Sequence, residues 1–160
     1  MSLKHDHLIG RTYASGKVDC YTLIREFYAD NFSITLPNYA RPHNWWDHGL
    51  NLYMDSFYDH GFRPMNDHPR EWRVGDAALM AIRSTIPNHA GVFVEQGKLL
   101  HHMMGRLSTV EDYRGLWRNS TIIVLRHKDI PDPTPTPSNI QLEDMLPNAV
   151  RQRLAALISR

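Results

Sequence analysis

The segment Gly16-Lys-Val-Asp-Cys-Tyr-Thr-Leu-Ile-Arg-Glu-Phe-Tyr28 decides the fold and contains the only cysteine of the chain, Cys20. Cys20 and the apolar residues after it recur at the spacing of one helix face, which predicts a helix over about 20–31. Asp19 is a natural N-cap, so Cys20 becomes the first helical residue. A thiol there feels the positive end of the helix dipole, which lowers its pKa and favours the nucleophilic thiolate.

A second segment, from Asn88 to His102, predicts a β-hairpin with strands at 89–95 and 98–104. Gln96-Gly97 supplies the turn between them. His89 opens the first strand, and His101 and His102 lie on the second. A cysteine at a helix start and a histidine on a strand are the parts of a Cys–His catalytic pair, whose imidazole is oriented by a third group. Cys20 is then the nucleophile and His89 the base.

The histidine doublet leaves the third group open, because side chains alternate between the faces of a strand. A two-residue turn at Gln96-Gly97 pairs residue 89 with residue 104 and puts His102 on the side of His89. A three-residue loop selects His101 instead.

Three motifs together resemble the NlpC/P60 cysteine peptidases: Asp19-Cys20, Gly75-Asp76 before a strand, and His89-x-Gly-x5-Gly-x3-His101. The resemblance covers about residues 5–127 and is closest to the branch of the family found in the tail tips of lambda-like phages. It implies an α+β, papain-like fold in which the catalytic helix packs on an antiparallel sheet.

The resemblance also implies roles for individual residues. The ungapped spacing from His89 makes His101 the third member of the triad. Tyr13, ahead of the Asp-Cys pair, belongs near the oxyanion position, and Asp19 belongs with it at the substrate end of the site. Much of the family has serine directly after the catalytic cysteine, where this chain has Tyr21; the phage branch shares this departure, which therefore does not indicate inactivation.

The function implied by the resemblance is that of a peptidoglycan endopeptidase acting without a cofactor. Its substrate is the wall stem peptide, cut between D-γ-glutamate and a diamino acid. The phage branch implies a place in the host cytoplasm during assembly and in the virion tail tip afterwards. Two alternatives stay open: a catalytically silent plug of a tail tip, and a cysteine amidase or acyltransferase on the same fold.

The composition excludes several other classes of protein. The 160 residues are 42% hydrophobic and carry a net charge of +1, from 18 basic and 17 acidic residues, which does not favour a nucleic-acid partner. One cysteine excludes an intrachain disulfide, and it leaves the ten histidines without the ligand set of a structural zinc site. The sequence has no apolar stretch of the ~20 residues that a membrane span needs and no apolar core of a secretory signal at its start.

The rest of the chain is divided by composition. A helix is expected at about 45–59, a strand at 76–82, a helix at about 109–115 after a Ser108–Glu111 capping box, and a strand at 121–126. Residues 1–127 are expected to form the peptidase domain and residues 128–138 a Pro-rich linker. In the tail, 139–160, Pro147 opens an amphipathic helix, which we expect to anchor the protein to other tail tip or hub proteins.

Overall fold

The computed structural model describes residues 3–65 and 71–131, and these form one compact unit that ends at Ile130. The predicted tail helix and residues 132–138 of the predicted linker lie outside the described residues. In chain order the elements are η1 (Asp6–Leu8), α1 (Cys20–Phe32), η2 (Trp45–His48), α2 (Leu52–Ser56), β1 (Phe62–Pro64), β2 (Ala77–Met80), β3 (His89–Glu95), β4 (Lys98–His101), β5 (Thr109–Asp112), α3 (Leu116–Ser120) and β6 (Thr121–His127).

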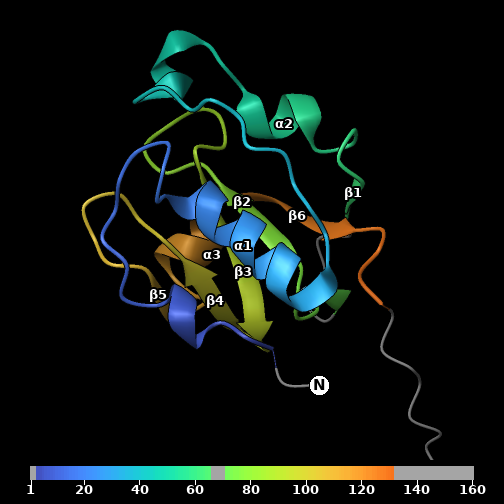
Figure 1. The fold of residues 1–160 in the computed structure, drawn as a ribbon. Coiled ribbons are helices and arrows are strands. Elements are labelled where there is room, and N and C mark those ends of the chain that lie inside the picture. The colour runs from blue at the N-terminus through green and yellow to red at the C-terminus, as the bar shows by residue number, and fades with distance from the viewer. Residues whose placement is uncertain (1–2, 66–70, 132–160) are drawn as a thin grey trace, which may run out of the picture. The chain divides into compact units, whose positions relative to one another are not determined.

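The strands form one six-stranded sheet in the order β1-β6-β2-β3-β4-β5, with every neighbouring pair antiparallel. Helix α1 crosses one face of this sheet, and α3 lies on the other (Figure 1). The larger core lies between α1 and the sheet, and a smaller one lies under Trp117 of α3. The predicted α+β architecture, a helix followed by an antiparallel sheet, is therefore confirmed. None of the helices in the described ranges is long and apolar enough to cross a bilayer.

Helix α1 begins at the predicted residue because Asp19 caps it. The Asp19 backbone is extended, and its carboxylate accepts a hydrogen bond from the amide of Thr22. The apolar stripe that runs from Leu23 to Tyr28 is buried against the sheet. At the far end, the hydroxyl of Tyr28 donates a 2.6 Å hydrogen bond to the carbonyl of Gly75. The two motifs that carry Cys20 and Gly75 are thus tied to each other through the helix.

The Gly75-Asp76 motif fixes the entry into β2. Gly75 has a φ of 93°, and a Cβ there would lie 2.9 Å from the ring of Phe32. Asp76 is fully buried and binds both nitrogens of the Arg126 fork at 2.7 Å, joining β2 to β6. The motif therefore holds the sheet and α1 together.

The hairpin β3–β4 contains a register shift that the turn alone does not predict. Glu95 pairs with Lys98, so the turn at Gln96-Gly97 has two residues, the first of the two alternatives. The register then shifts by one residue, and Gly91 pairs with His101. This irregularity, and not a longer loop, puts His101 on the face of the sheet that carries His89.

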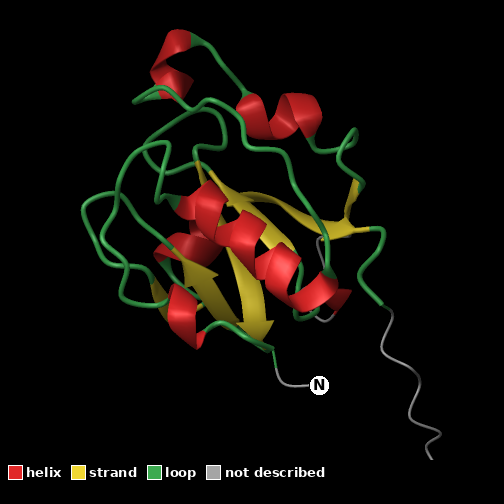
Figure 2. Cartoon of the chain, viewed as in Figure 1, coloured by secondary structure: helices red, strands yellow, loops and turns green. Residues whose placement is uncertain are grey.

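Two of the predicted helices differ from the structure, the first in part and the second completely. The helix expected at about 45–59 is two short helices, η2 and α2, separated by residues 49–51 (Figure 2). Gly49, which ends η2, has a φ of 75°, a left-handed conformation that interrupts the helical hydrogen bonds.

The helix expected at about 109–115 is instead strand β5, whose Thr109 pairs with His101 on β4. Ser108 is the reason that the capping box does not form. Its hydroxyl donates to the carbonyl of Leu8 at 2.7 Å and accepts from the amide of Arg11 at 2.8 Å, so it is committed to the N-terminal segment.

Candidate active site

A cavity of about 240 Å³ lies at the N-terminus of α1 and the start of β3. Cys20 and His89 both line it, as do Tyr13 and His102. The predicted nucleophile and base, 69 positions apart in the sequence, therefore open onto the same space. His101 does not line the cavity; it is fully buried behind His89.

The thiol of Cys20 is almost completely buried and lies 3.3 Å from the hydroxyl of Tyr53. In the described part of the chain, this hydroxyl and not an imidazole nitrogen is its side-chain hydrogen-bond partner. Burial raises the pKa of the Cys20 thiol, and the Asp19 carboxylate raises it further. The Tyr53 hydroxyl, the backbone amide of Ala90 and the Arg41 guanidinium act in the opposite direction without reversing the shift. The expectation of a lowered thiol pKa is therefore wrong, because burial of the thiol raises its pKa.

Asp19 is held by a buried ion pair with Arg41. The Arg41 Nε donates to one carboxylate oxygen at 2.8 Å, and the two side chains are 6% and 5% exposed. The same carboxylate accepts from the amides of Gly16 and Thr22. Burial by itself raises the pKa of Asp19, but the hydrogen bonds from Arg41 and Thr22 outweigh it, and the pKa is lowered. Asp19 thus fixes the backbone that carries Cys20 and has no oxygen directed at the cavity, which it does not line.

His89 and His101 form the imidazole pair of the site. The Nε2 of His89 lies 3.2 Å from the Nδ1 of His101, and the rings meet at 85°. This contact leaves the Nδ1 of His89 as the nitrogen available on the cavity side. Gly91, which faces His101 across the ladder, has no side chain, and a Cβ there would lie 2.8 Å from Leu99.

Both imidazoles are neutral at pH 7. Burial lowers the pKa of His89 to about 3, and the neighbouring histidines lower it as well. Burial also lowers the pKa of His101 to about 4, against the opposing effect of Glu111. The pKa of the Cys20 thiol is raised and that of His89 is lowered. The site therefore holds a thiol and a neutral imidazole, and not a thiolate–imidazolium pair. A neutral imidazole is the form that can accept a proton.

His102 follows directly after β4 and borders the cavity together with Cys20 and His89. Its ring meets that of Tyr13 edge to face at 5.2 Å. Burial raises the pKa of Tyr13 well above its ordinary value, so its hydroxyl keeps its proton and remains a donor. Tyr13 thus lines the cavity as a protonated hydroxyl.

Behind the imidazole pair lies a group that the sequence did not single out. Trp117 packs on His101 with ring centroids 4.2 Å apart, and it also covers His89 at 5.9 Å. Its Nε1 donates to one carboxylate oxygen of Glu111 at 2.8 Å. The other oxygen of Glu111 accepts from Arg106 at 2.9 Å and lies 3.9 Å from the Nε2 of His101.

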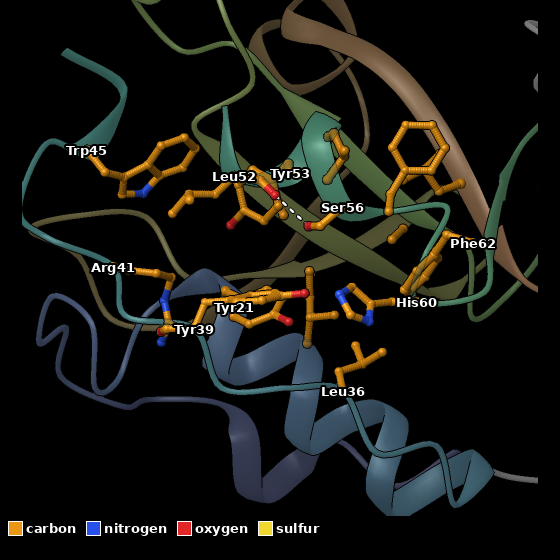
Figure 3. Close-up of a pocket in the computed structure, with 16 residues that line it drawn as sticks. Tyr21, Leu36, Tyr39, Arg41, Trp45, Leu52, Tyr53, Ser56, His60 and Phe62 are labelled. Carbon is orange, nitrogen blue, oxygen red and sulfur yellow. Dashed lines mark hydrogen bonds between the residues drawn. The ribbon is translucent and has the colours of Figure 1, made fainter. Parts of the chain in front are cut away.

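Tyr53 also lines a second, smaller cavity of about 50 Å³ (Figure 3). Aromatic rings of Tyr21, Tyr39 and Trp45 line it together with the guanidinium of Arg41. Tyr53 thus borders this apolar space and contacts the thiol of Cys20 through its hydroxyl. Within residues 45–59, Tyr53 and Phe57 pack with the core, whereas Leu50 and Tyr58 are exposed.

Sequence reasoning missed four residues of this site: Arg41, Tyr53, Glu111 and Trp117. Arg41 lies in a loop with no periodic pattern, so no signal identified it. Glu111 had been assigned to a capping box, and a strand interpretation of 109–112 would have placed it beside β4. No group of three or more histidine, cysteine, aspartate or glutamate side chains within the described ranges is arranged to hold a metal ion.

Comparison with known proteins agrees with this geometry. Residues 10–126 match the NlpC/P60 family. The chain is 34% identical over 125 residues to the tail tip assembly protein K of Escherichia phage N15, covering 77% of this chain and 50% of that protein. It is 36% identical over 122 residues to the tail tip assembly protein K of Escherichia phage lambda, covering 76% of this chain and 60% of that protein. The chain thus spans between half and three-fifths of the length of these relatives.

A solved structure from Staphylococcus aureus, described as similar to lipoprotein of the NLP/P60 family, shares the fold. It superposes with a TM-score of 0.55 at 20% identity, over 79% of this chain and 39% of that one. The α+β fold of the NlpC/P60 type, expected from the resemblance, is therefore confirmed. The family match over residues 10–126 and the identity to the two phage proteins show that this chain belongs to the NlpC/P60 family.

Proposed function

We propose that this protein is a cysteine peptidase that hydrolyses amide bonds in the stem peptides of peptidoglycan. One observation carries the proposal: Cys20 and His89 open onto one cavity, with His101 bonded behind His89. Family membership supports the same chemistry. His101, and not His102, is the third member of the triad in this proposal, because it contacts the base.

In the proposed reaction, the Nδ1 of His89 accepts the thiol proton while the sulfur of Cys20 attacks the amide carbonyl carbon. The oxyanion accepts hydrogen bonds from the backbone amide of Cys20 at the helix start and from the hydroxyl of Tyr13. His89 then passes its proton to the leaving amine, and the C–N bond breaks to leave a thioester. Water, deprotonated by His89, cleaves the thioester and restores the thiol.

The charged groups at the cavity suit a stem peptide. The exposed side chains of Arg83 and Asp47 line the cavity and carry opposite charges. A stem peptide offers both a carboxylate at the γ-glutamyl residue and an ammonium group on the diamino acid. We therefore assign the bond between D-γ-glutamate and a diamino acid as the substrate bond, with Arg83 as the carboxylate partner and Asp47 as the ammonium partner.

The test is muropeptide analysis of purified Gram-negative sacculi, incubated with the wild-type protein and with Cys20→Ala. New stem-peptide fragments from the wild type alone would establish the hydrolase, and their masses would identify the bond. No fragments from either protein would contradict the proposal for the isolated chain.

A second candidate is a catalytically silent structural component of a tail tip. The contact of Cys20 with Tyr53 and not with His89 favours it, because the resting thiol has no base in hydrogen-bond reach among the described residues. Reaction of Cys20 with a small alkylating reagent at a rate that falls on replacement of His89 by Gln would argue against this candidate. The amidase or acyltransferase alternative differs only in the acceptor, and a thioester resolved by an amine would identify it.

We also propose that the protein acts in a phage tail tip, where its two phage relatives are named as assembly proteins. Residues 139–160, whose sequence pattern predicts an amphipathic helix, would contact other tail tip or hub proteins. A chain that ends at residue 131 should then keep its hydrolytic activity and fail to enter particles. Normal incorporation of the shortened chain would disprove this anchoring role.

A further inference from the structure

The far end of the imidazole pair holds an incomplete hydrogen bond. The Nε2 of His101 is buried and has no hydrogen-bond partner within residues 3–65 and 71–131. A carboxylate oxygen of Glu111 lies 3.9 Å from this nitrogen. The distance is beyond hydrogen-bond range, but it is too short for a water molecule to fit between the two atoms. A buried imidazole N–H without a hydrogen-bond partner costs free energy. A hydrogen bond between this nitrogen and this oxygen would remove that cost.

Strand pairing and a hydrogen bond from Trp117 hold Glu111 in this position. It lies on β5, where it pairs with Leu99 of β4, two residues before His101 and on the same face. The indole of Trp117 donates to its second oxygen at 2.8 Å. Its side chain is 27% exposed, so it can keep its charge while its inner oxygen faces the buried ring. A side-chain movement of about 1 Å brings that oxygen into hydrogen-bond range.

Glu111, His101 and His89 form a row. The group at the Glu111 end determines which atom donates in each hydrogen bond of the row. A carboxylate only accepts, so it requires the proton of His101 to be on Nε2. The Nδ1 of His101 is then an acceptor, and the Nε2 of His89 must donate to it. The Nδ1 of His89 is left without a proton, which is the state that can take the proton of Cys20.

The opposite direction disables the base. If His101 carries its proton on Nδ1, the Nε2 of His89 must accept, and the neutral His89 then carries its proton on Nδ1, toward the thiol. Trp117 does not distinguish these arrangements, because it covers both rings with an apolar face.

We propose that Glu111 is a positioning residue that sets the tautomers of His101 and, through it, of His89. This inference rests on the proposed role of His89 as the base and extends the triad by one residue. Glu111 touches neither the thiol nor the cavity, and it acts only through the hydrogen-bond row. The two rings, the indole and the carboxylate thus form one unit.

The first test uses the unmodified protein. Nitrogen-15 NMR of histidine-labelled full-length chain at pH 7 distinguishes protonated from unprotonated ring nitrogens. The expected result is a proton on Nε2 and none on Nδ1 for both His89 and His101. A proton on Nδ1 of His101, or on both of its nitrogens, would overturn the proposal without any variant.

The second test compares Glu111→Gln with Asp112→Asn, a neighbouring carboxylate that pairs with Lys98 on the surface. The amide introduced by Glu111→Gln can present its NH2 group to the Nε2 of His101 and so favour the disabling direction. The rate of Cys20 alkylation by iodoacetamide should fall about 10- to 100-fold, the usual range for loss of an orienting partner, with the NMR signals of His89 changing tautomer. Asp112→Asn should leave both readouts unchanged.

A wild-type rate of alkylation in Glu111→Gln, with unchanged histidine signals, would refute the positioning role. If Glu111→Gln does not fold, the wild-type spectrum alone decides. Neither test uses peptidoglycan, so failure of the sacculus experiment with these results intact would count against the proposed substrate and not against Glu111.

Discussion

Two carboxylates support the two halves of the site, and they do so in different ways. Asp19 lies under the nucleophile, where its oxygens accept from Arg41 and from two backbone amides. Glu111 lies behind the base, where one oxygen is held by Trp117 and the other stops 3.9 Å short of His101. The Asp19 carboxylate is buried and accepts hydrogen bonds at both of its oxygens. The Glu111 carboxylate is partly exposed and does not reach the buried Nε2 of His101.

The difference separates a structural role from a directional one. A fully bonded, buried ion pair fixes geometry, and its loss is expected to affect stability first. A carboxylate at the end of a row of imidazoles sets proton positions, and its loss is expected to affect reactivity first.

The largest effect is expected from Asp19→Asn. Asparagine keeps an oxygen that can cap α1, but it leaves the buried guanidinium of Arg41 without its counter-charge. Breaking one partner of a buried pair costs about 3–5 kcal/mol. The free energy of unfolding, measured by urea denaturation at pH 7, should fall by that amount.

Asp112→Asn is the matched control, because it neutralises an exposed carboxylate whose partner Lys98 is 44% exposed. Exposed surface pairs contribute little to stability, because water screens them. Equal, small losses for Asp19→Asn and Asp112→Asn would show that the buried pair does not hold the helix start.

The next effect concerns pH. The folded pKa values of His89 and His101 are about 3 and about 4, below the ordinary value of 6.5. The unfolded chain therefore binds more protons as the pH falls below 6.5, so folding stability decreases with acidification. At pH 5 the loss is about 2 kcal/mol for each imidazole.

Urea denaturation at pH 7 and pH 5 measures this loss. His89→Gln should reduce the difference between the two pH values by about 2 kcal/mol, because one titrating imidazole is gone. Asp19 contributes in a separate window, since its lowered pKa affects stability only as the pH falls through and below 3.8. A stability independent of pH between 7 and 5 would show that the two imidazoles are not buried as neutral rings.

The contrast also shows what the sequence could predict. Asp19, Cys20 and the apolar stripe of α1 are consecutive, and local rules place them correctly. The hairpin of His89 and His101 was predicted as well, since its turn and strands are local. The side of the strand that His101 takes depends on a one-residue shift between Phe93 and Glu95, which no turn signal marks.

Glu111 illustrates the limit more sharply. Four residues, Ser108 to Glu111, match a helix-capping pattern, yet Ser108 bonds to Leu8 and Arg11, about 100 positions earlier. That distant pairing decides between helix and strand, and only the strand brings Glu111 behind His101. The same holds for Arg41, whose loop reaches Asp19 through tertiary contacts alone.

A smaller effect is expected from Tyr53→Phe. The Tyr53 hydroxyl favours the thiolate of Cys20, so its removal raises the thiol pKa. One hydrogen bond contributes about 0.5–1.5 kcal/mol, which corresponds to alkylation about 2- to 10-fold slower at a fixed pH. Tyr58→Phe, on an exposed side chain away from the thiol, is the control. Faster alkylation by Tyr53→Phe would mean instead that the hydroxyl withholds the thiol from His89.

The smallest effect is expected from Arg106→Gln, which removes the outer partner of Glu111. Arg106 is 56% exposed, so its ion pair is screened by water and contributes about 0–1 kcal/mol. Trp117 still holds the carboxylate, and the freed oxygen has His101 as its remaining partner. Iodoacetamide alkylation of Cys20 should therefore stay within about 2-fold of the wild-type rate. A loss as large as that of Glu111→Gln would mean that Arg106, and not the indole, keeps the carboxylate in place, and the positioning unit would then extend to the protein surface.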